Sequence, residues 1–344
     1  MVWHSCNNCK VGERVNCASR SSIAVCFIAL AFGIVPNSVV QSNDDPIAKH
    51  SAIIVVGAPG EDEYVDTFRA AAMRWMEVCR ANDIDVVLVD GTTGSTTEES
   101  DRDQILRWID EKPAQERWIV LIGHGTSDRD ATKFNLRGRD LSAEELAKSV
   151  AKHDASRWLI VHCGSSSGPW INALSGPNRV VITATKSGAE QNYTRFGEYL
   201  SQTISDPDSD LDHDASVSIL EAFLAASKRV TQFYSDEDRI PSEQALLEDN
   251  NDKKGTPAVF YRGVRPIKSP ADGLKLDGTL AARIQVATLK PQKEMTLGQR
   301  LELEQLEDQL EVLRAKKQET EETRYYEAVE LLFMEIIRVR EIDS

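Results

Sequence analysis

Two predicted strands of this 344-residue chain end in residues that could together carry out nucleophilic catalysis. The strand Arg117–Ile122 is followed by a Gly-His-Gly turn centred on His124. A later strand, Arg157–Val161, is followed by the segment His162–Gly168 (HCGSSSG), which offers one thiol and three hydroxyl groups. Nucleophilic catalysis requires a base beside the nucleophile and backbone N–H groups that hold an oxyanion. Strand ends in an α/β sheet meet both needs, because the carboxyl ends of parallel strands share one edge.

Strands and helices are expected to alternate over residues 50–235. Continuous apolar runs are typical of strands that are buried on both faces. The expected strands are Ala52–Val56, Asp85–Val89, Arg117–Ile122, Arg157–Val161 and Arg179–Thr185. The expected helices are Tyr64–Arg80, Asp101–Asp110, a helix that starts at Leu141 with a capping box of Ser142 and Glu145, Arg195–Ile204 and Val217–Tyr234. This order predicts an α/β fold with a mostly parallel sheet and helices on both faces.

Three segments of this region together resemble the legumain-type branch of the caspase-like (clan CD) cysteine peptidases. They are Val120–Gly125 (VLIGHG), Trp158–Gly168 and Val180–Leu200, and they are similar to exported bacterial members of that branch. The resemblance covers about residues 53–234. It implies a caspase-like fold, hydrolysis of a peptide or protein substrate, and no cofactor. In that family a His-Gly pair supplies the general base and part of the oxyanion hole, roles that would fall to His124 and Gly125.

The second motif departs from the family pattern, in which the nucleophile lies in a Cys-x-Ser-Gly context. Aligning the Ser-Gly pair at the end of the segment puts Ser165 at the nucleophile position and Cys163 two residues earlier. Three interpretations stay open. Ser165 is a hydroxyl nucleophile served by His124, or Cys163 is a displaced nucleophile whose thiol pKa is lowered by His162 or His124. In the third, the site is inactive and the chain is a binding or scaffolding module.

The loop after the first predicted strand carries the candidate substrate-pocket residues Glu61 and Asp62. In the family resemblance this loop borders the substrate pocket, so we expect these carboxylates to meet a basic side chain. The preceding turn, Gly57–Gly60, lacks the spacing of a dinucleotide-binding loop and the Lys-Ser/Thr of a P-loop. A nucleotide site is therefore not expected.

The first 42 residues differ in character from the rest. Lys10, Arg14 and Arg20 precede Ile23–Val35, which holds no charged residue, and a small residue, Ser42, follows. This arrangement predicts a secretory signal peptide and an exported location, periplasmic or secreted. The alternative is an uncleaved N-terminal membrane anchor, although a membrane span needs about 20 apolar residues.

No metal site is expected. Cys6 and Cys9 have half the spacing of a zinc site, but no second pair follows. The acidic segment 248–252 resembles part of a calcium loop, yet Lys253 stands at the place of the central glycine and no glutamate closes the loop. We therefore interpret it as a solvated turn. The formal net charge of −15 argues against nucleic acid as a partner.

Residues 236–295 are rich in Asp, Lys, Pro and Gly, which predicts an extended connection between the peptidase-like domain of residues 50–235 and a helical tail. The tail, residues 296–341, carries two apolar repeats with coiled-coil spacing. The repeats are Leu303, Leu306, Leu310 and Leu313, then Val329, Leu332, Ile336 and Val339. They are out of phase, which predicts either a helical hairpin or one helix with a stutter. Such a tail packs on the main domain or drives self-association.

Overall fold

The computed structural model describes residues 48–91, 99–128, 131–268, 276–289, 295–317 and 319–341. The predicted signal peptide, residues 1–42, lies outside these ranges, and the chain divides into units of residues 1–45 and 46–344. All the described residues belong to the second unit. Within the described residues, no helix is long and apolar enough to cross a membrane.

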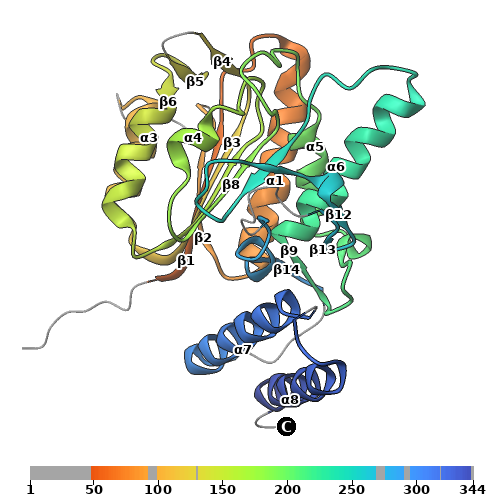
Figure 1. The fold of residues 1–344 in the computed structure, drawn as a ribbon. Coiled ribbons are helices and arrows are strands. Elements are labelled where there is room, and N and C mark those ends of the chain that lie inside the picture. The colour runs from red at the N-terminus through yellow and green to blue at the C-terminus, as the bar shows by residue number, and fades with distance from the viewer. Residues whose placement is uncertain are drawn as a thin grey trace, which may run out of the picture. The chain divides into compact units, whose positions relative to one another are not determined.

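A seven-stranded sheet with the order β11-β10-β8-β7-β3-β1-β2 forms the centre of this unit (Figure 1). Its five parallel strands are β1 (Ala48–Val56), β2 (Asp85–Val89), β3 (Ala114–Ile122), β7 (Arg157–His162) and β8 (Arg179–Thr183). The short strands β10 (Leu246–Glu248) and β11 (Thr256–Pro257) extend one edge in antiparallel register. The parallel strands coincide closely with the predicted apolar runs.

Helices cover both faces of this sheet. On one face lie α1 (Asp62–Ala81), α5 (Phe196–Thr203) and α6 (Ile219–Asp236), and on the other lie α2 (Asp101–Glu111), α3 (Ala143–Val150) and α4 (Trp170–Leu174). Successive residues of β1 alternate between the two cores: Ile54 packs with the first group of helices and Ile53 with the second. The predicted fold class, a mostly parallel sheet with helices on both faces, is confirmed.

Several helix starts follow from local sequence. The predicted capping box of Ser142 and Glu145 is present at α3, where each side chain accepts a backbone N–H of the other residue. Ser218 and Glu221 form the same arrangement at α6. Because each box satisfies two backbone donors that the helix leaves unpaired, it sets the residue at which the helix begins.

Shorter elements connect the layers. A small three-stranded sheet follows the end of β3 along the chain. Its strands are β4 (Gly125–Ser127), β5 (Thr132–Phe134) and β6 (Leu141–Ser142). Two further pairs are β9 (Ser216–Ser218) with β14 (Gln285–Thr288), and β12 (Tyr261–Arg262) with β13 (Arg265–Pro266). Single 3₁₀ turns occur at Ala151–His153, Pro207–Ser209, Ala258–Phe260 and Ala281–Arg283.

The C-terminal segment consists of two helices, α7 (Leu297–Ala315) and α8 (Glu322–Glu341). They pack together through residues of the two apolar repeats, Leu303 and Leu310 on α7 with Ile336 and Val339 on α8. Of the two alternatives drawn from the sequence, the pair of helices is therefore the one that forms.

Candidate active site

The His124 ring lies just beyond the end of β3, in an aromatic surrounding. It makes edge contacts with Tyr64 and Phe68 of α1, at centroid distances of 5.0 and 5.2 Å, and with Tyr193 at 6.3 Å. Its Nε2 lies 3.0 Å from the carbonyl oxygen of Pro59. A carbonyl oxygen only accepts hydrogen bonds, so Nε2 must carry the proton and donate it. Nδ1 therefore holds the lone pair, and a neutral His124 can act as a base through Nδ1.

Ser165 and Gly125 lie against each other, as expected from their positions at neighbouring strand ends. The Ser165 hydroxyl donates to the Gly125 carbonyl oxygen at 3.0 Å, and the Gly125 N–H lies 3.4 Å from the Ser165 Oγ. The approach is so close that a Cβ at residue 125 would lie 2.4 Å from the Ser165 carbonyl oxygen. Only glycine fits there. Within the described residues the Ser165 hydroxyl makes no hydrogen bond to His124.

The loop that follows Ser165 is held by the segment after β8. Ser166 adopts a positive φ of 53° and donates its hydroxyl to the Gly188 carbonyl oxygen at 3.0 Å. The next hydroxyl, of Ser167, lies 3.1 Å from that of Thr185. A left-handed backbone at a non-glycine residue is uncommon. It is sustained here by these contacts, which fix where Ser165 stands.

Cys163 is buried in the core on the α1, α5 and α6 face of the sheet. A Cβ at Gly197 of α5 would lie 2.4 Å from the Cys163 Cβ and 3.0 Å from its Sγ, so the thiol is directed at that helix. Burial raises the pKa of the Cys163 thiol to about 12. At neutral pH it is a protonated thiol, and a thiol is a poor nucleophile compared with a thiolate.

His162 lies on the opposite face of the sheet from Cys163. Its ring makes edge contacts with Phe134 and Trp170, at centroid distances of 5.3 and 4.6 Å. Its Nδ1 accepts the Gly164 N–H at 3.0 Å, and burial lowers the pKa of His162 to about 3. Neighbouring residues of a strand point to opposite faces. His162 is therefore neutral and directed away from the thiol, so of the open interpretations the structure does not support the one in which His162 lowers the pKa of Cys163.

The candidate pocket residues Glu61 and Asp62 lie at the start of α1, Glu61 as its N-cap and Asp62 as its first residue, and both are exposed. The Glu61 N–H donates to the Pro59 carbonyl oxygen at 2.9 Å, the same oxygen that His124 contacts. The predicted substrate loop and the His124 ring are thus connected through Pro59.

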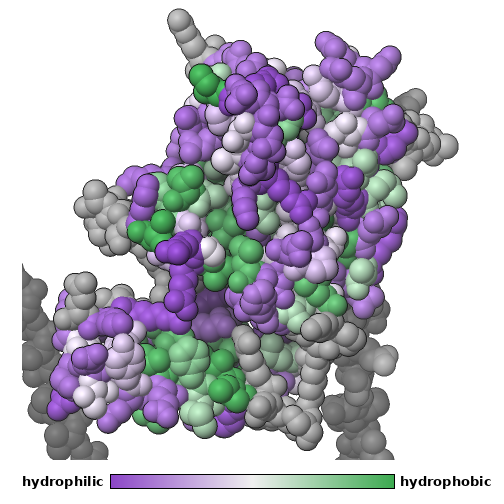
Figure 2. Space-filling view, turned by 90° about the vertical axis from the view of Figure 1, so that its right-hand side faces the viewer, coloured by the Kyte–Doolittle hydropathy of each residue, from purple (hydrophilic) through white to green (hydrophobic). Residues whose placement is uncertain are grey.

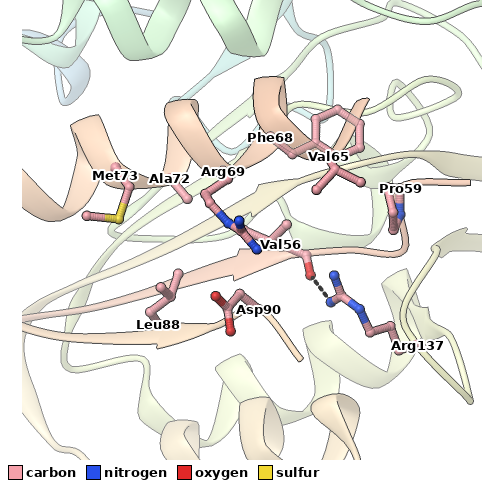
Figure 3. A pocket seen from close by; sticks show the side chains of 10 residues that line it. All are labelled: Val56, Pro59, Val65, Phe68, Arg69, Ala72, Met73, Leu88, Asp90 and Arg137. Carbon is pink, nitrogen blue, oxygen red and sulfur yellow. Dashed lines mark hydrogen bonds between the residues drawn. The ribbon is translucent and has the colours of Figure 1, made fainter. Parts of the chain in front are cut away.

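A pocket of about 80 Å³ lies between α1 and the ends of β1 and β2 (Figure 3). Phe68 and Pro59, which both contact His124, form part of its wall, but neither Glu61 nor Asp62 lines it. Two basic residues, Arg69 and Arg137, do line it. Arg137 donates to the Val56 carbonyl oxygen at 2.9 Å. No local pattern in the sequence indicated these arginines, because they come from separate elements.

The structure also brings together two groups of carboxylates. One is Asp210, Asp212 and Asp214, and the other is Glu248, Asp252 and Asp277; within each group one oxygen per residue lies within 4.8 Å of the others. The segment 248–252, which was predicted to be a solvated turn, contributes Glu248 and Asp252 to the second group, and that prediction is wrong for Glu248, because its side chain is buried. The spacing of the first group was visible: its aspartates and Glu221 occupy positions 1, 3, 5 and 12 of a calcium-loop pattern. The second group includes a residue distant in the sequence, so no spacing could show it.

No protein-family model and no curated protein sequence matches the chain. Similar solved structures include the Drosophila initiator caspase Dronc, at 12% identity, a TM-score of 0.38, and coverage of 61% of this chain and 82% of that one. Caspase-1 from Spodoptera frugiperda matches at 10% identity, a TM-score of 0.38, and coverage of 59% and 87%. TM-scores this low support no conclusion about activity.

Proposed function

We propose that this chain is a caspase-like, legumain-type peptidase homologue that hydrolyses peptide bonds with Ser165 as the nucleophile and His124 as the base. The observation that carries the proposal is the hydrogen bond from His124 Nε2 to the Pro59 carbonyl oxygen. A base that is oriented by a third group is characteristic of nucleophilic active sites. The Gly125 N–H beside Ser165 is the second supporting feature, because it can hold an oxyanion.

The proposed reaction is acyl transfer. The Ser165 Oγ attacks the substrate carbonyl carbon while its proton passes to His124 Nδ1, and the oxyanion that forms accepts the Gly125 N–H. His124 then gives the proton to the leaving amine, and water hydrolyses the acyl-enzyme by the same route. For this chemistry the Ser165 hydroxyl must leave the Gly125 carbonyl oxygen, by rotation about its Cα–Cβ bond, when a substrate binds.

Cys163 is given a structural role in this proposal. Its thiol is directed at Gly197 and its pKa is about 12, so it offers very little thiolate at neutral pH. The Cys163 N–H donates to the Leu121 carbonyl oxygen of the neighbouring strand at 2.8 Å, which holds the end of β7 in the conformation that directs this thiol at α5.

One observation favours the inactive alternative. Ser165 is 4% exposed, and its hydroxyl lies within hydrogen-bond distance of both the N–H and the carbonyl oxygen of Gly125. If that arrangement persists with substrate present, the site binds peptide without cleaving it, and the chain is a binding or scaffolding module.

Export and self-association belong to the same proposal. Export rests on the cationic and apolar pattern of the first 42 residues. Self-association through the C-terminal helices rests on an apolar row of α8: Leu331, Met334 and Ile337 are 68%, 61% and 46% exposed. Apolar surface over these helices is visible at the bottom of Figure 2. Exposed rows at this spacing are typical of helices that meet another helix.

The test is covalent labelling of the purified chain with a fluorophosphonate probe, read by peptide mass spectrometry, together with turnover of a peptide library. The proposal predicts a label on Ser165 that is lost in His124→Ala, whereas Cys163→Ala keeps it. A chain that shows no label and no turnover, but binds peptides, would identify the inactive module. A thiol-directed peptide probe that labels Cys163 in a His124-dependent way would instead restore the cysteine-type reaction.

A further inference from the structure

The second carboxylate group lies at the antiparallel edge of the sheet. Glu248 ends β10, Asp252 follows in the loop to β11, and Asp277 comes from a segment 25 residues further along the chain. One carboxylate oxygen of each lies within 4.8 Å of the others. Glu248 is 0% exposed and Asp277 is 3% exposed. Carboxylates buried this close together repel one another and lose their hydration, unless a proton or a cation neutralises them.

Glu248 provides a second, separate observation. Its Oε1 accepts the Ser175 hydroxyl at 2.8 Å and the Lys253 N–H at 3.4 Å. Its Oε2 is buried and has no hydrogen-bond partner among the residues that the structure describes. Within the same ranges, none of the three carboxylates forms an ion pair with a lysine or an arginine. A fully buried carboxylate oxygen without a partner is costly, and it indicates that something missing from the chain itself contacts it.

We propose that Glu248, Asp252 and Asp277 bind a divalent cation, with Ca²⁺ as the preferred ion. Carboxylate oxygens are ligands for hard cations. Ca²⁺ binds oxygen at about 2.3–2.6 Å, so two ligand atoms on opposite sides of the ion are about 5 Å apart. A separation within 4.8 Å is therefore suited to one shared ion. Mg²⁺ requires shorter bonds and a near-ideal octahedron, which three carboxylates from two segments are less able to supply.

The ion would tie two distant segments of the chain together. Asp277 already accepts the Asp249 N–H at 2.8 Å and the Asn250 N–H at 3.2 Å, and its other oxygen accepts the Thr256 hydroxyl. Asp277 is thereby fixed against the loop between β10 and β11. A cation held by Asp277, Glu248 and Asp252 would close this loop on the edge of the sheet. Its role is structural, and it is independent of whether Ser165 is catalytic.

The first carboxylate group is the competing source of calcium binding. In the loop from Asp210 to Glu221 the acids have calcium-loop spacing, but each of these carboxylates already accepts backbone N–H groups. No buried oxygen without a partner marks these four side chains. An Asp212→Asn variant therefore serves as the matched control.

The experiment measures calcium binding by titration calorimetry and thermal unfolding in Ca²⁺ or EGTA, on the purified chain. At a Ca²⁺ concentration about a hundredfold above Kd, we expect the Tm to be roughly 5 °C higher than in EGTA. Glu248→Gln should abolish this increase while the protein stays folded in EGTA, and Asp212→Asn should retain the contribution of the Glu248 site. Asp252→Asn, at a half-buried position, is a second variant in case Glu248→Gln does not fold. Absence of binding by the unmodified chain would overturn the proposal. The proposal would also be overturned if Asp212→Asn abolished calcium binding while Glu248→Gln and Asp252→Asn left it unchanged.

Discussion

The placement of Cys163 makes a quantitative prediction about its alkylation. Burial raises the pKa of this thiol from the ordinary value of 9.0 to about 12. Iodoacetamide reacts with the thiolate. A pKa that is higher by about three units lowers the thiolate fraction near pH 7.5 roughly a thousandfold. Burial against Gly197 slows the reaction further, so native Cys163 should react at least a thousandfold more slowly than in the unfolded chain.

The assay is a time course of iodoacetamide labelling in native buffer and in guanidinium chloride, with each cysteine quantified by peptide mass spectrometry. Cys79 is the internal control, because it is also fully buried and burial raises its pKa to about 12 as well. The two cysteines should be protected to a similar extent, and His124→Ala should leave both rates unchanged.

One result would refute this reasoning. If Cys163 is labelled within minutes in the native protein while Cys79 is protected, and if His124→Ala slows the labelling, then Cys163 is an activated nucleophile. The end of β7 would then have a different conformation in solution, and the assignment of Ser165 to the nucleophile position would be wrong.

Three further predictions follow from other parts of the molecule. Burial lowers the pKa of His162 to about 3. Below about pH 6.5 the His162 imidazole therefore binds a proton in the unfolded chain but not in the folded one, so the free energy of unfolding falls as the pH is lowered. Between about pH 6.5 and pH 3, the free energy of unfolding measured in urea should fall by about 1.4 kcal/mol for each pH unit. His162→Gln should remove that slope, and an unchanged slope would contradict the neutral assignment. Gly125→Ala should destabilise the fold by about 2 kcal/mol, because its Cβ would lie 2.4 Å from the Ser165 carbonyl oxygen, whereas Gly298→Ala, with no Cβ contact closer than 3.9 Å, should not. Equal unfolding curves for these two variants would count against the tight contact. Deleting residues 296–344 should reduce the solution mass measured by light scattering to that of a monomer, and a full chain that is already monomeric would exclude self-association.

The parallel sheet could be predicted because its strands are continuous apolar runs, which are typical of strands buried on both faces. The predicted ends of β2 and β3 coincide with the observed ones, at Val89 and Ile122. By contrast, β10 spans only Leu246–Glu248, three residues with no detectable period, inside a segment that was predicted to be an extended connection. Such a strand forms because it pairs with β8, which is a tertiary effect.

The candidate site was predictable in position but not in detail. The juxtaposition of Gly125 and Ser165 follows from strand order alone. The opposite orientations of His162 and Cys163 follow from the two-residue period of a strand, because neighbouring residues point to opposite faces of the sheet. The contact between His124 and Pro59 joins residues 65 positions apart, and only the folded chain could reveal it.

The central claim, that residue 165 occupies the nucleophile position beside the base His124, is tested most directly by Ser165→Cys. A thiol at this position should form a pair with His124 after the same rotation away from the Gly125 carbonyl oxygen that the proposed reaction requires. It should then be alkylated by iodoacetamide at or below neutral pH, faster than an ordinary cysteine. The measurement is the pH profile of alkylation of this thiol, with Cys79 and Cys163 as protected internal references. We expect an apparent pKa well below the ordinary cysteine value, which returns to that value when His124→Ala is added. An ordinary pH profile that His124→Ala does not change would contradict it.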